Sequence, residues 1–277
     1  MTCQKVIKSN VVCYAKGKPF VALKKKKPTG YVIYDGPSLL DGKPIVVIAI
    51  VRTTNIKTGN MVQTYILRSD MHPLEANKSG EDYSICGNCI HRGQSHSDPT
   101  LKTAKKRTCY VNLGQGVLQV YKSYLNGNYP MLNTHEEIAE IGRGRMVRIG
   151  TYGDGGAVPL YKFDSLLTHS EGHTAYGHQS DIVGSSHDSS YMMCSADNEQ
   201  QATNAWSRGE RTFRVISNVS ELVPQKEILC PASKEMGYRT TCDKCKLCSG
   251  SDIMAKSIAI VVHGAGSTNF QQQNVNH

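Results

Sequence analysis

Short apolar runs of strand length recur along the chain, and they constrain its fold more than any other feature. The longest lie at residues 45–51 and 258–262, and several runs are continuous rather than alternating with polar residues. A continuous run is typical of a strand buried on both faces, as in a parallel sheet. No run approaches the roughly 18 apolar residues that span a bilayer. The sequence therefore predicts a soluble globular protein rather than a membrane protein.

Helical patterns lie between several of these runs. Thr134 and Glu137 make a capping box for a helix that ends near residue 141, and Asp197 is a good N-cap for a helix over 198–206. Strands and helices alternate from about residue 110 to 216, which predicts an α/β fold with a barrel-like or mostly parallel sheet. Further helices are expected at 116–125 and 158–167, and strands at 31–34, 45–51, 61–67, 109–111, 146–151, 174–176, 191–195, 212–216, 228–230 and 258–262.

The first 30 residues are predicted to form a tail or edge element, and residues 31–277 a single α/β domain. The division falls after the lysine run 24–27, where Pro28, Thr29 and Gly30 give a turn signal. No apolar segment of signal-peptide length follows the first methionine, so we expect a reducing compartment. There the ten cysteines favour metal ligation or catalysis over disulfides.

The cysteines near the C-terminal end form the sharpest motif. Cys242, Cys245 and Cys248 are separated by two residues each, and Cys230 lies twelve positions before Cys242. Two-residue gaps let a tight turn direct successive thiolates at one ion, and a fourth thiolate closes the site. The spacing predicts a metal-binding loop over 230–248 that holds zinc or a 4Fe-4S cluster.

A second cysteine group predicts another metal-binding loop, over 86–109. Cys86 and Cys89 are two residues apart, and His91 and Cys109 follow. With His91 as a fourth ligand the site would be closed and structural, whereas an open fourth position would let the metal contact a substrate. Both interpretations stay open at this point. Cys194 is a candidate nucleophile, a candidate ligand or a small buried apolar residue.

Polar residues follow the apolar part of several expected strands. In α/β folds the carboxyl ends of the strands are where sites are assembled. We therefore take Asp154 and His178 as candidate catalytic residues, and Arg148 and Tyr152 as candidate substrate-binding residues. The alternative is that each caps the turn that follows it.

The charge balance points to an anionic partner. The formal net charge is +9, with basic residues gathered at 24–27 and at Lys102, Lys105, Lys106 and Arg107. A basic surplus favours nucleic acid or a nucleotide as partner. Solvated surface loops are the alternative.

Several short motifs recur in a pattern met in other proteins. They are Tyr34-Asp35-Gly36-Pro37-Ser38, Lys57-Thr58-Gly59-Asn60-Met61, Leu67-Arg68-Ser69-Asp70, Cys86-Gly87-Asn88-Cys89-Ile90-His91-Arg92, Gly142-Arg143-Gly144-Arg145-Met146-Val147-Arg148, Gly153-Asp154 and Cys230-Pro231-Ala232-Ser233. These motifs resemble those of a cysteine-rich family of bacteriophage-encoded proteins. The resemblance runs from residue 31 to 267 and implies phage origin and the host cytoplasm, but it implies no activity.

The strand-end motifs and cysteine clusters are also similar, more distantly, to phage proteins related to radical S-adenosylmethionine barrels. That resemblance implies a 4Fe-4S cluster held by three cysteines, with S-adenosylmethionine on the open iron. The chain departs from the pattern, because two residues separate Cys86 from Cys89 and Cys109 lies twenty positions beyond Cys89.

Two hypotheses follow. The first is an iron-sulfur or zinc metalloenzyme that acts on nucleic acid or a nucleotide, with a closed four-cysteine site and a three-cysteine site open to the substrate. The second is a non-catalytic nucleic-acid-binding or host-interaction protein in which both cysteine groups hold structural zinc. The sequence does not decide whether the chain is an enzyme, and oligomeric state is not legible from it.

Overall fold

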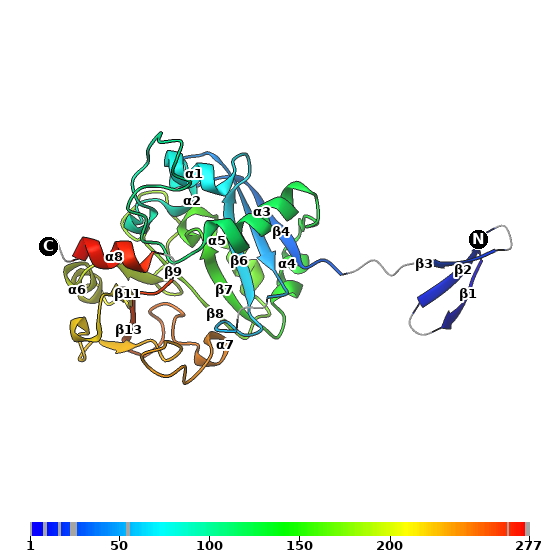
Figure 1. The fold of residues 1–277 in the computed structure, drawn as a ribbon. Coiled ribbons are helices and arrows are strands. Elements are labelled where there is room, and N and C mark those ends of the chain that lie inside the picture. Colours follow the sequence, from blue (N-terminus) through cyan, green and yellow to red (C-terminus); the bar gives the residue numbers. More distant parts are fainter. Residues whose placement is uncertain are drawn as a thin grey trace.

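The computed structural model describes residues 2–7, 10–15, 18–22, 27–53, 56–264 and 266–274. The first three strands, β1 (Thr2–Ile7), β2 (Asn10–Ala15) and β3 (Lys18–Ala22), form an antiparallel sheet of their own (Figure 1). This sheet occupies the stretch for which the sequence predicts a tail or edge element. Of the lysine run at 24–27, all but Lys27 lies outside the described residues.

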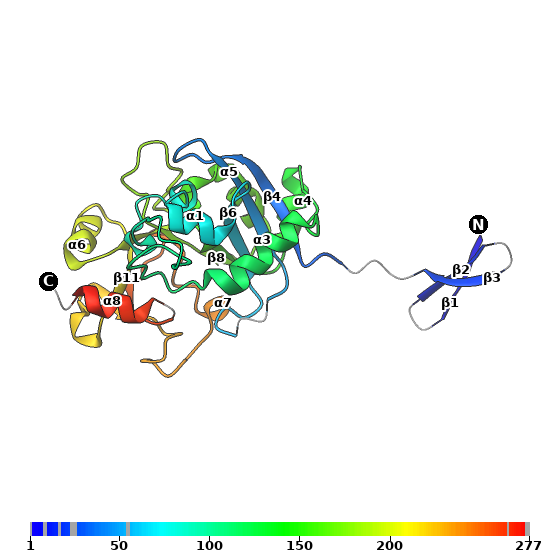
Figure 2. The same cartoon turned by 45° about the horizontal axis from the view of Figure 1, so that its top comes forward.

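A mixed five-stranded sheet follows, in the order β4 (Gly30–Pro37), β5 (Pro44–Ile50), β6 (Val62–Arg68), β7 (Met146–Tyr152) and β8 (Gly172–Thr174). The strands β4, β5 and β6 are antiparallel, and β6, β7 and β8 are parallel. The parallel pairing expected for 45–51 is therefore wrong. This run is apolar because every residue of β5 after Pro44 is buried. Figure 2 shows α1 and α3 in front of the sheet and α5 behind it.

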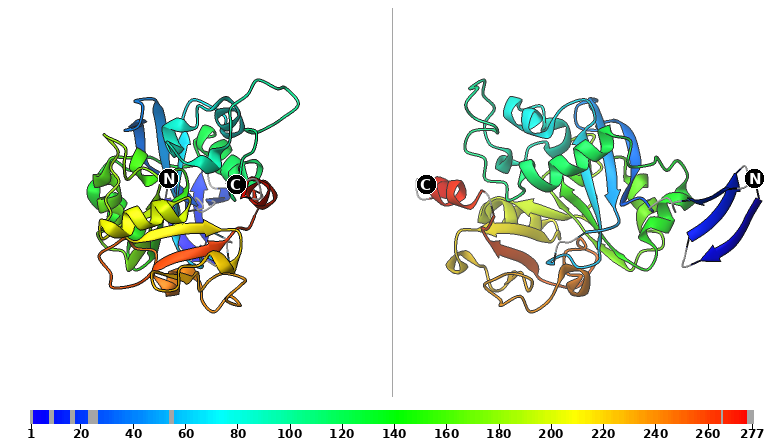
Figure 3. Two further views of the ribbon diagram at one scale, coloured as in Figure 1. Left: turned by 90° about the vertical axis from the view of Figure 1, so that its left-hand side faces the viewer. Right: turned by 45° about the vertical axis from the view of Figure 1, so that its right-hand side comes forward.

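The second five-stranded sheet is entirely parallel. Its order is β12 (Glu227–Leu229), β13 (Ser257–Val261), β11 (Thr212–Ile216), β10 (Met193–Ala196) and β9 (Tyr176–Gly177). Only Ala175 separates β8 of the first sheet from β9 of the second, so the segment from Gly172 to Gly177 belongs to both sheets. The second sheet, drawn in yellow to orange-red, lies beside the first in Figure 3.

The mixed α/β class is confirmed, but the described strands do not close into a barrel. Closure would need the outer edge of β4 to pair with β12. A connecting segment covers part of that edge instead. The Val32 amide donates to the Pro130 carbonyl at 3.0 Å, and the Leu132 amide donates to the Val32 carbonyl at 2.9 Å. These hydrogen bonds use the backbone groups of Val32 that a closing strand would need.

The helices are mostly short, and one expected cap is wrong. The capping box of Thr134 and Glu137 is present, but the N-cap of α6 is Asn198, whose side chain accepts from the Gln201 amide at 2.9 Å. The Asp197 side chain therefore does not cap this helix. The α-helices are α1 (Pro73–Ser79), α2 (Tyr83–Cys86), α3 (Leu118–Leu125), α4 (His135–Gly142), α5 (Leu160–Leu167), α6 (Glu199–Ser207), α7 (Cys242–Cys245) and α8 (Ser267–Asn274), and the shorter turns are η1 (Ile90–Arg92), η2 (Leu113–Val117), η3 (Gly155–Ala157) and η4 (Val219–Glu221).

The strand expected at 109–111 is an irregular segment in the structure. The Arg107 guanidinium donates to the carbonyls of Cys109 at 3.0 Å and Val111 at 2.8 Å. A side chain thus satisfies backbone acceptors that a neighbouring strand would otherwise satisfy. In the part of the chain that the structure describes, no helix is long and apolar enough to cross a bilayer.

Candidate functional site

A cavity of about 480 Å³ lies at the carboxyl ends of the parallel strands of both sheets. Residues from the ends of β7, β9, β10, β11 and β13 line it, as expected for an α/β fold. The sequence predicts two separate metal-binding loops, and the structure places members of both at this one cavity. The six cysteines that line it are Cys86, Cys89, Cys109, Cys230, Cys242 and Cys248.

The turn between Cys86 and Cys89 is held by a buried glutamine. The side-chain amide of Gln179 donates to the Cys86 carbonyl at 2.8 Å, and its oxygen accepts from the Asn88 amide at 3.3 Å. Gly87 has φ of +51°, and a Cβ there would lie 2.1 Å from Gln179 Oε1. The turn therefore requires glycine for its backbone conformation and for space.

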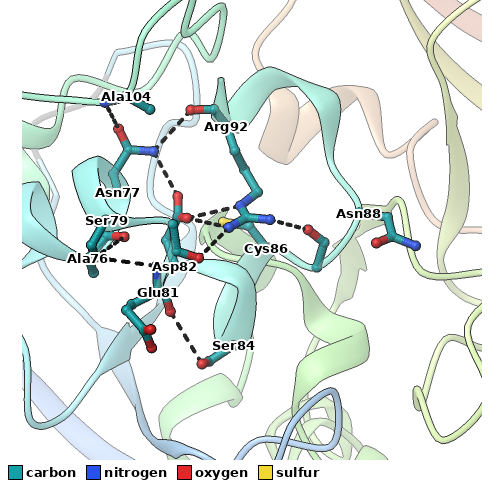
Figure 4. Close-up of polar contacts among 12 residues, drawn as sticks. Ala76, Asn77, Ser79, Glu81, Asp82, Ser84, Cys86, Asn88, Arg92 and Ala104 are labelled. Carbon is teal, nitrogen blue, oxygen red and sulfur yellow. Dashed lines mark hydrogen bonds and ion pairs between the residues drawn. The ribbon is translucent and has the colours of Figure 1, made fainter. Parts of the chain in front are cut away.

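On its other side the same turn is held by Arg92 (Figure 4). The guanidinium donates to the Gly87 carbonyl at 2.7 Å and to the Asp82 carboxylate at 2.6 Å. Asp82 is 1% exposed and also accepts from Asn77 at 2.7 Å. A buried carboxylate is stable when it is paired and hydrogen-bonded in this way, so Asp82 and Arg92 fix the start and end of the Cys86–Cys89 segment.

Backbone hydrogen bonds hold Cys109 near this turn. The carbonyl of His91 accepts from the amides of Thr108, at 3.2 Å, and Cys109, at 3.0 Å. The intervening loop folds back on itself, since Gln94 and Lys105 form an antiparallel bridge. The three cysteines of the first group are thus assembled by hydrogen bonds between segments about twenty residues apart.

The second cysteine group is anchored on three different segments. The Cys230 amide donates to the Ala259 carbonyl of β13 at 2.8 Å, and the Cys242 amide donates to the Lys57 carbonyl at 2.9 Å. The Cys248 carbonyl accepts from the amide of Ala175, the residue between β8 and β9, at 2.8 Å. Cys245 is not among the residues that line the cavity.

The thiols of each group lie close enough to affect one another's ionisation. Burial raises the pKa of Cys248, and the neighbouring Cys230, Cys242 and Cys245 raise it further. Burial likewise raises the pKa of Cys86, with added contributions from Asp82, Cys89 and Cys109. Burial therefore favours the protonated, unreactive form of the Cys86 and Cys248 thiols until a cation compensates the thiolate charge.

Arg148 places a positive charge in the cavity wall. Its Nη2 donates to the hydroxyl oxygens of Tyr110 at 2.7 Å and Tyr176 at 2.6 Å. Burial opposes this charge, but Tyr110, Tyr176 and the thiols of Cys242 and Cys248 outweigh burial and raise the pKa of Arg148. The guanidinium therefore stays charged beside the second cysteine group.

Four polar atoms in the cavity wall are buried and have no hydrogen-bond partner within the described residues. Buried polar atoms in proteins are rarely left without partners, so such a group marks a place where a ligand or water is bound. All four come from β7 and β8. They are Arg148 Nε, Thr151 Oγ1, Tyr152 OH and Thr174 Oγ1.

Asp154 is placed to position its neighbours. One carboxylate oxygen accepts from the Gly156 amide at 2.9 Å, and the other accepts from the His178 amide at 2.7 Å and from Gln179 at 3.1 Å. The carboxylate thus caps the turn η3, as the alternative interpretation of its sequence predicts, and also fixes the backbone of His178.

His178 points to a carboxylate that the sequence assigns to a helix cap. Its Nε2 lies 3.0 Å from Asp197 Oδ1, and His91 Nε2 lies 3.5 Å from the same oxygen. Burial lowers the pKa of His91 to about 4, and the nearby His178 adds to this effect. Burial also opposes a charge on His178, but Cys89 and Asp197 prevail and raise its pKa. Burial therefore disfavours a proton on His91, whereas the contacts with Cys89 and Asp197 favour one on His178.

Sets of three ligand atoms that lie within 4.8 Å of one another are few in the described chain. One set is His91, His178 and Asp197, and the other is Glu136, Glu140 and His169 at the surface. The two cysteine groups are not among these sets. Cys194 is buried, does not line the cavity and lies 3.5 Å from Ser180 Oγ, which fits the small buried apolar residue among its three expected roles.

Comparison with protein-family models, with curated proteins and with solved structures found no match for this chain. The resemblance to bacteriophage-encoded proteins stays a prediction.

Proposed function

We propose that this protein is a metalloenzyme that binds a nucleotide or a related small anion in the cavity between its two cysteine groups. The proposal is carried by one observation, that six of the seven cysteines predicted to bind metal line a single cavity. A volume of about 480 Å³ is of the size that encloses small molecules, for which the usual range is about 300–1,000 Å³. A metal ion that only stabilised a loop would not need ligands that line a cavity of this size.

The residues present fit a thiophilic metal centre. Buried thiols that raise one another's pKa are matched by a cation, which converts them to thiolates. Iron-sulfur clusters and zinc both select such ligands. Because the cysteine sulfurs are not yet gathered within ligand distance of one another, binding would draw them together.

The cavity wall supplies the groups that a nucleotide would need. Arg148 offers a half-buried positive charge for a phosphate. Tyr176 and Phe213 stack with their ring centroids 4.2 Å apart and give an apolar aromatic surface. The hydroxyls of Thr151, Tyr152 and Thr174 lack partners among the described residues and are free to bind polar substrate atoms.

Proton transfer in this cavity would fall to His178. Its pairing with Asp197 orients the imidazole, which suits His178 to proton transfer when no metal ion lies between the two side chains. Asp154, a candidate catalytic residue by sequence, supports this role by holding the backbone of His178, since hydrogen bonds to its neighbours occupy both of its carboxylate oxygens.

Anaerobic purification tests the proposal. Metal analysis and the visible spectrum of the full chain should show stoichiometric metal, with brown absorbance, iron and sulfide for a cluster, or a colourless protein with zinc. In the same preparation a nucleotide should bind to the native chain and bind at least tenfold more weakly to Arg148→Met. Metal-free native protein would overturn the proposal.

Two cysteine variants separate structural from functional use of the metal. Cys242→Ser should unfold or aggregate the chain, since its group joins the second sheet to the segment around Lys57. Cys89→Ser should spare folding and abolish activity. Equal loss of folding in both variants would favour two structural zinc sites.

The exposed lysines at 102, 105 and 106 favour a second candidate, a zinc-stabilised nucleic-acid-binding or host-interaction protein. Such binding would weaken steeply with added salt and would be lost when these lysines are replaced by glutamine. Nucleotide binding that survives in the triple variant would favour the enzyme.

A further inference from the structure

Two imidazoles and one carboxylate meet beside the first cysteine group. His91, His178 and Asp197 come from three separate segments, and their side chains are 13%, 16% and 8% exposed. At bond lengths near 2.1 Å, neighbouring ligand atoms are about 3.0 Å apart in an octahedral site and about 3.4 Å apart in a tetrahedral one. The Nε2–Oδ1 distances of 3.0 Å for His178 and 3.5 Å for His91 are close to these two values.

Hydrogen bonds outside the cluster hold both histidines in place. His91 Nδ1 lies 2.8 Å from Thr108 Oγ1, and if Nδ1 donates to this hydroxyl, the lone pair is on Nε2, which faces Asp197. The backbone of His178 is fixed by the Asp154 carboxylate at 2.7 Å. Metal-binding histidines are usually oriented by such contacts to their other ring nitrogen and backbone.

We propose that His91, His178 and Asp197 bind a divalent transition-metal ion whose open coordination positions face the cavity. Two histidines and one carboxylate are a ligand set that leaves positions free for substrate or water, as in non-haem iron(II) sites. Both histidines line the cavity, so a bound ion would contact its contents. The ligand atoms proposed here are imidazole nitrogens and a carboxylate oxygen; the site adjoins Cys89, which hydrogen-bonds His178, but it does not rest on the cysteines binding metal.

The same contacts would also arise from an ion pair between His178 and Asp197 with His91 packed beside it. The two rings are 5.7 Å apart in an edge-on arrangement, which suits either case. In the ion pair, His178 carries a proton on Nε2, the nitrogen that faces Asp197. In the metal site, the metal ion would take the place of that proton. The experiment therefore has to detect the metal and its nitrogen ligands directly.

Manganese(II) is a selective probe, because it prefers oxygen and nitrogen ligands whereas thiolates select zinc, copper(I) and iron-sulfur clusters. Titration of the full chain, followed by electron paramagnetic resonance, should show one equivalent bound in the cavity site. Asp197→Asn should weaken this binding at least tenfold. His169→Gln, in the surface set of Glu136, Glu140 and His169, is the matched control and should leave it unchanged.

A measurement on the native chain tests the proposal even if the Asp197→Asn variant misfolds. Spin-echo modulation from the bound manganese should show coupling to imidazole nitrogen from two histidines. Absence of that coupling, or equal binding by native protein and Asp197→Asn, would overturn the proposal. Metal at the cysteines is followed separately by thiolate charge-transfer absorbance with cobalt(II), so the two proposals fail independently.

Discussion

Gln179 is 0% exposed, and its side-chain amide lies 3.1 Å from the Asp154 carboxylate and 2.8 Å from the Cys86 carbonyl. One amide group therefore ties the end of β7 to the turn that carries the first cysteine group. The geometry of that turn depends on the fit between Gln179 and Gly87.

Replacement of Gly87 by alanine should disrupt this fit. Gly87 has φ of +51° and ψ of −129°, a backbone conformation that favours glycine, and the contact of an added Cβ with Gln179 costs about 1–3 kcal/mol of overpacking. Gly127→Ala is the control, because Gly127 has φ of +66° and no atom lies within 4 Å of the place that a Cβ would take there. Chemical denaturation should show a larger loss for Gly87→Ala, and equal losses would contradict the role given to Gln179.

The buried pair of Arg214 and Glu227 should be costly to break. Arg214 Nη2 lies 2.6 Å from Glu227 Oε2, and the side chains are 4% and 0% exposed. Glu227→Ala leaves a buried guanidinium without its partner, so the free energy of unfolding should fall by about 3–5 kcal/mol. The double variant Arg214→Met, Glu227→Leu should recover much of this loss. A single variant as stable as the native chain in urea would refute this expectation.

The helix α6 should depend on Asn198 for its N-terminal cap. Asn198→Ala removes the acceptor for the Gln201 amide and should lower the free energy of unfolding by about 1 kcal/mol. Asn198→Ser keeps an acceptor and serves as the control. If both variants unfold at the same denaturant concentration, the cap contributes nothing measurable.

Asp70 should stabilise the fold above its own titration range and not below it. The hydrogen bond from Arg68 lowers the pKa of Asp70, although partial burial opposes the shift and Lys43 adds to it. Since the folded pKa lies below the unfolded value of about 3.9, this stabilisation is present above about pH 4 and is lost as the pH falls through the folded pKa.

Comparison of the native chain with Asp70→Asn across pH measures this effect. The stability difference should be constant from about pH 5 to 7 and shrink below about pH 4. Glu81 also faces Arg68 and Lys43 and is present in both chains, so the difference measures the charge of Asp70 together with its coupling to Glu81 through Arg68. Replacement of the exposed Asp252 by asparagine provides a control, and a difference that grows toward acid would contradict the assignment.

Local patterns predicted much of the fold, because they depend on neighbouring residues. The capping box at Thr134 and most strands of both sheets are found where the sequence places them. Strand direction was wrong for 45–51, since a continuous apolar run records burial on two faces and carries no information on the partner. The strand at 109–111 was wrong because the Arg107 contacts that replace it depend on a loop that closes on itself.

The sequence predicted most of the individual site residues, but not that they line a single cavity. Spacing alone marks the two cysteine groups, and strand-end position marks Arg148, Tyr152, Asp154 and His178. Their meeting at one cavity depends on pairing between strands far apart in sequence. Asp197 was assigned to the cap because aspartate suits that position, and the next residue, Asn198, suits it equally well. The position of Asp197 directly after β10 was the sequence feature that could have marked it as a site residue.

The segment Gly172–Gly177 carries the chain from one sheet into the other. The Ala175 carbonyl accepts from the Met193 amide at 3.0 Å, and the Ala175 amide donates to the Cys248 carbonyl at 2.8 Å. The crossing point of the two sheets therefore also sets where the last cysteine of the chain lies.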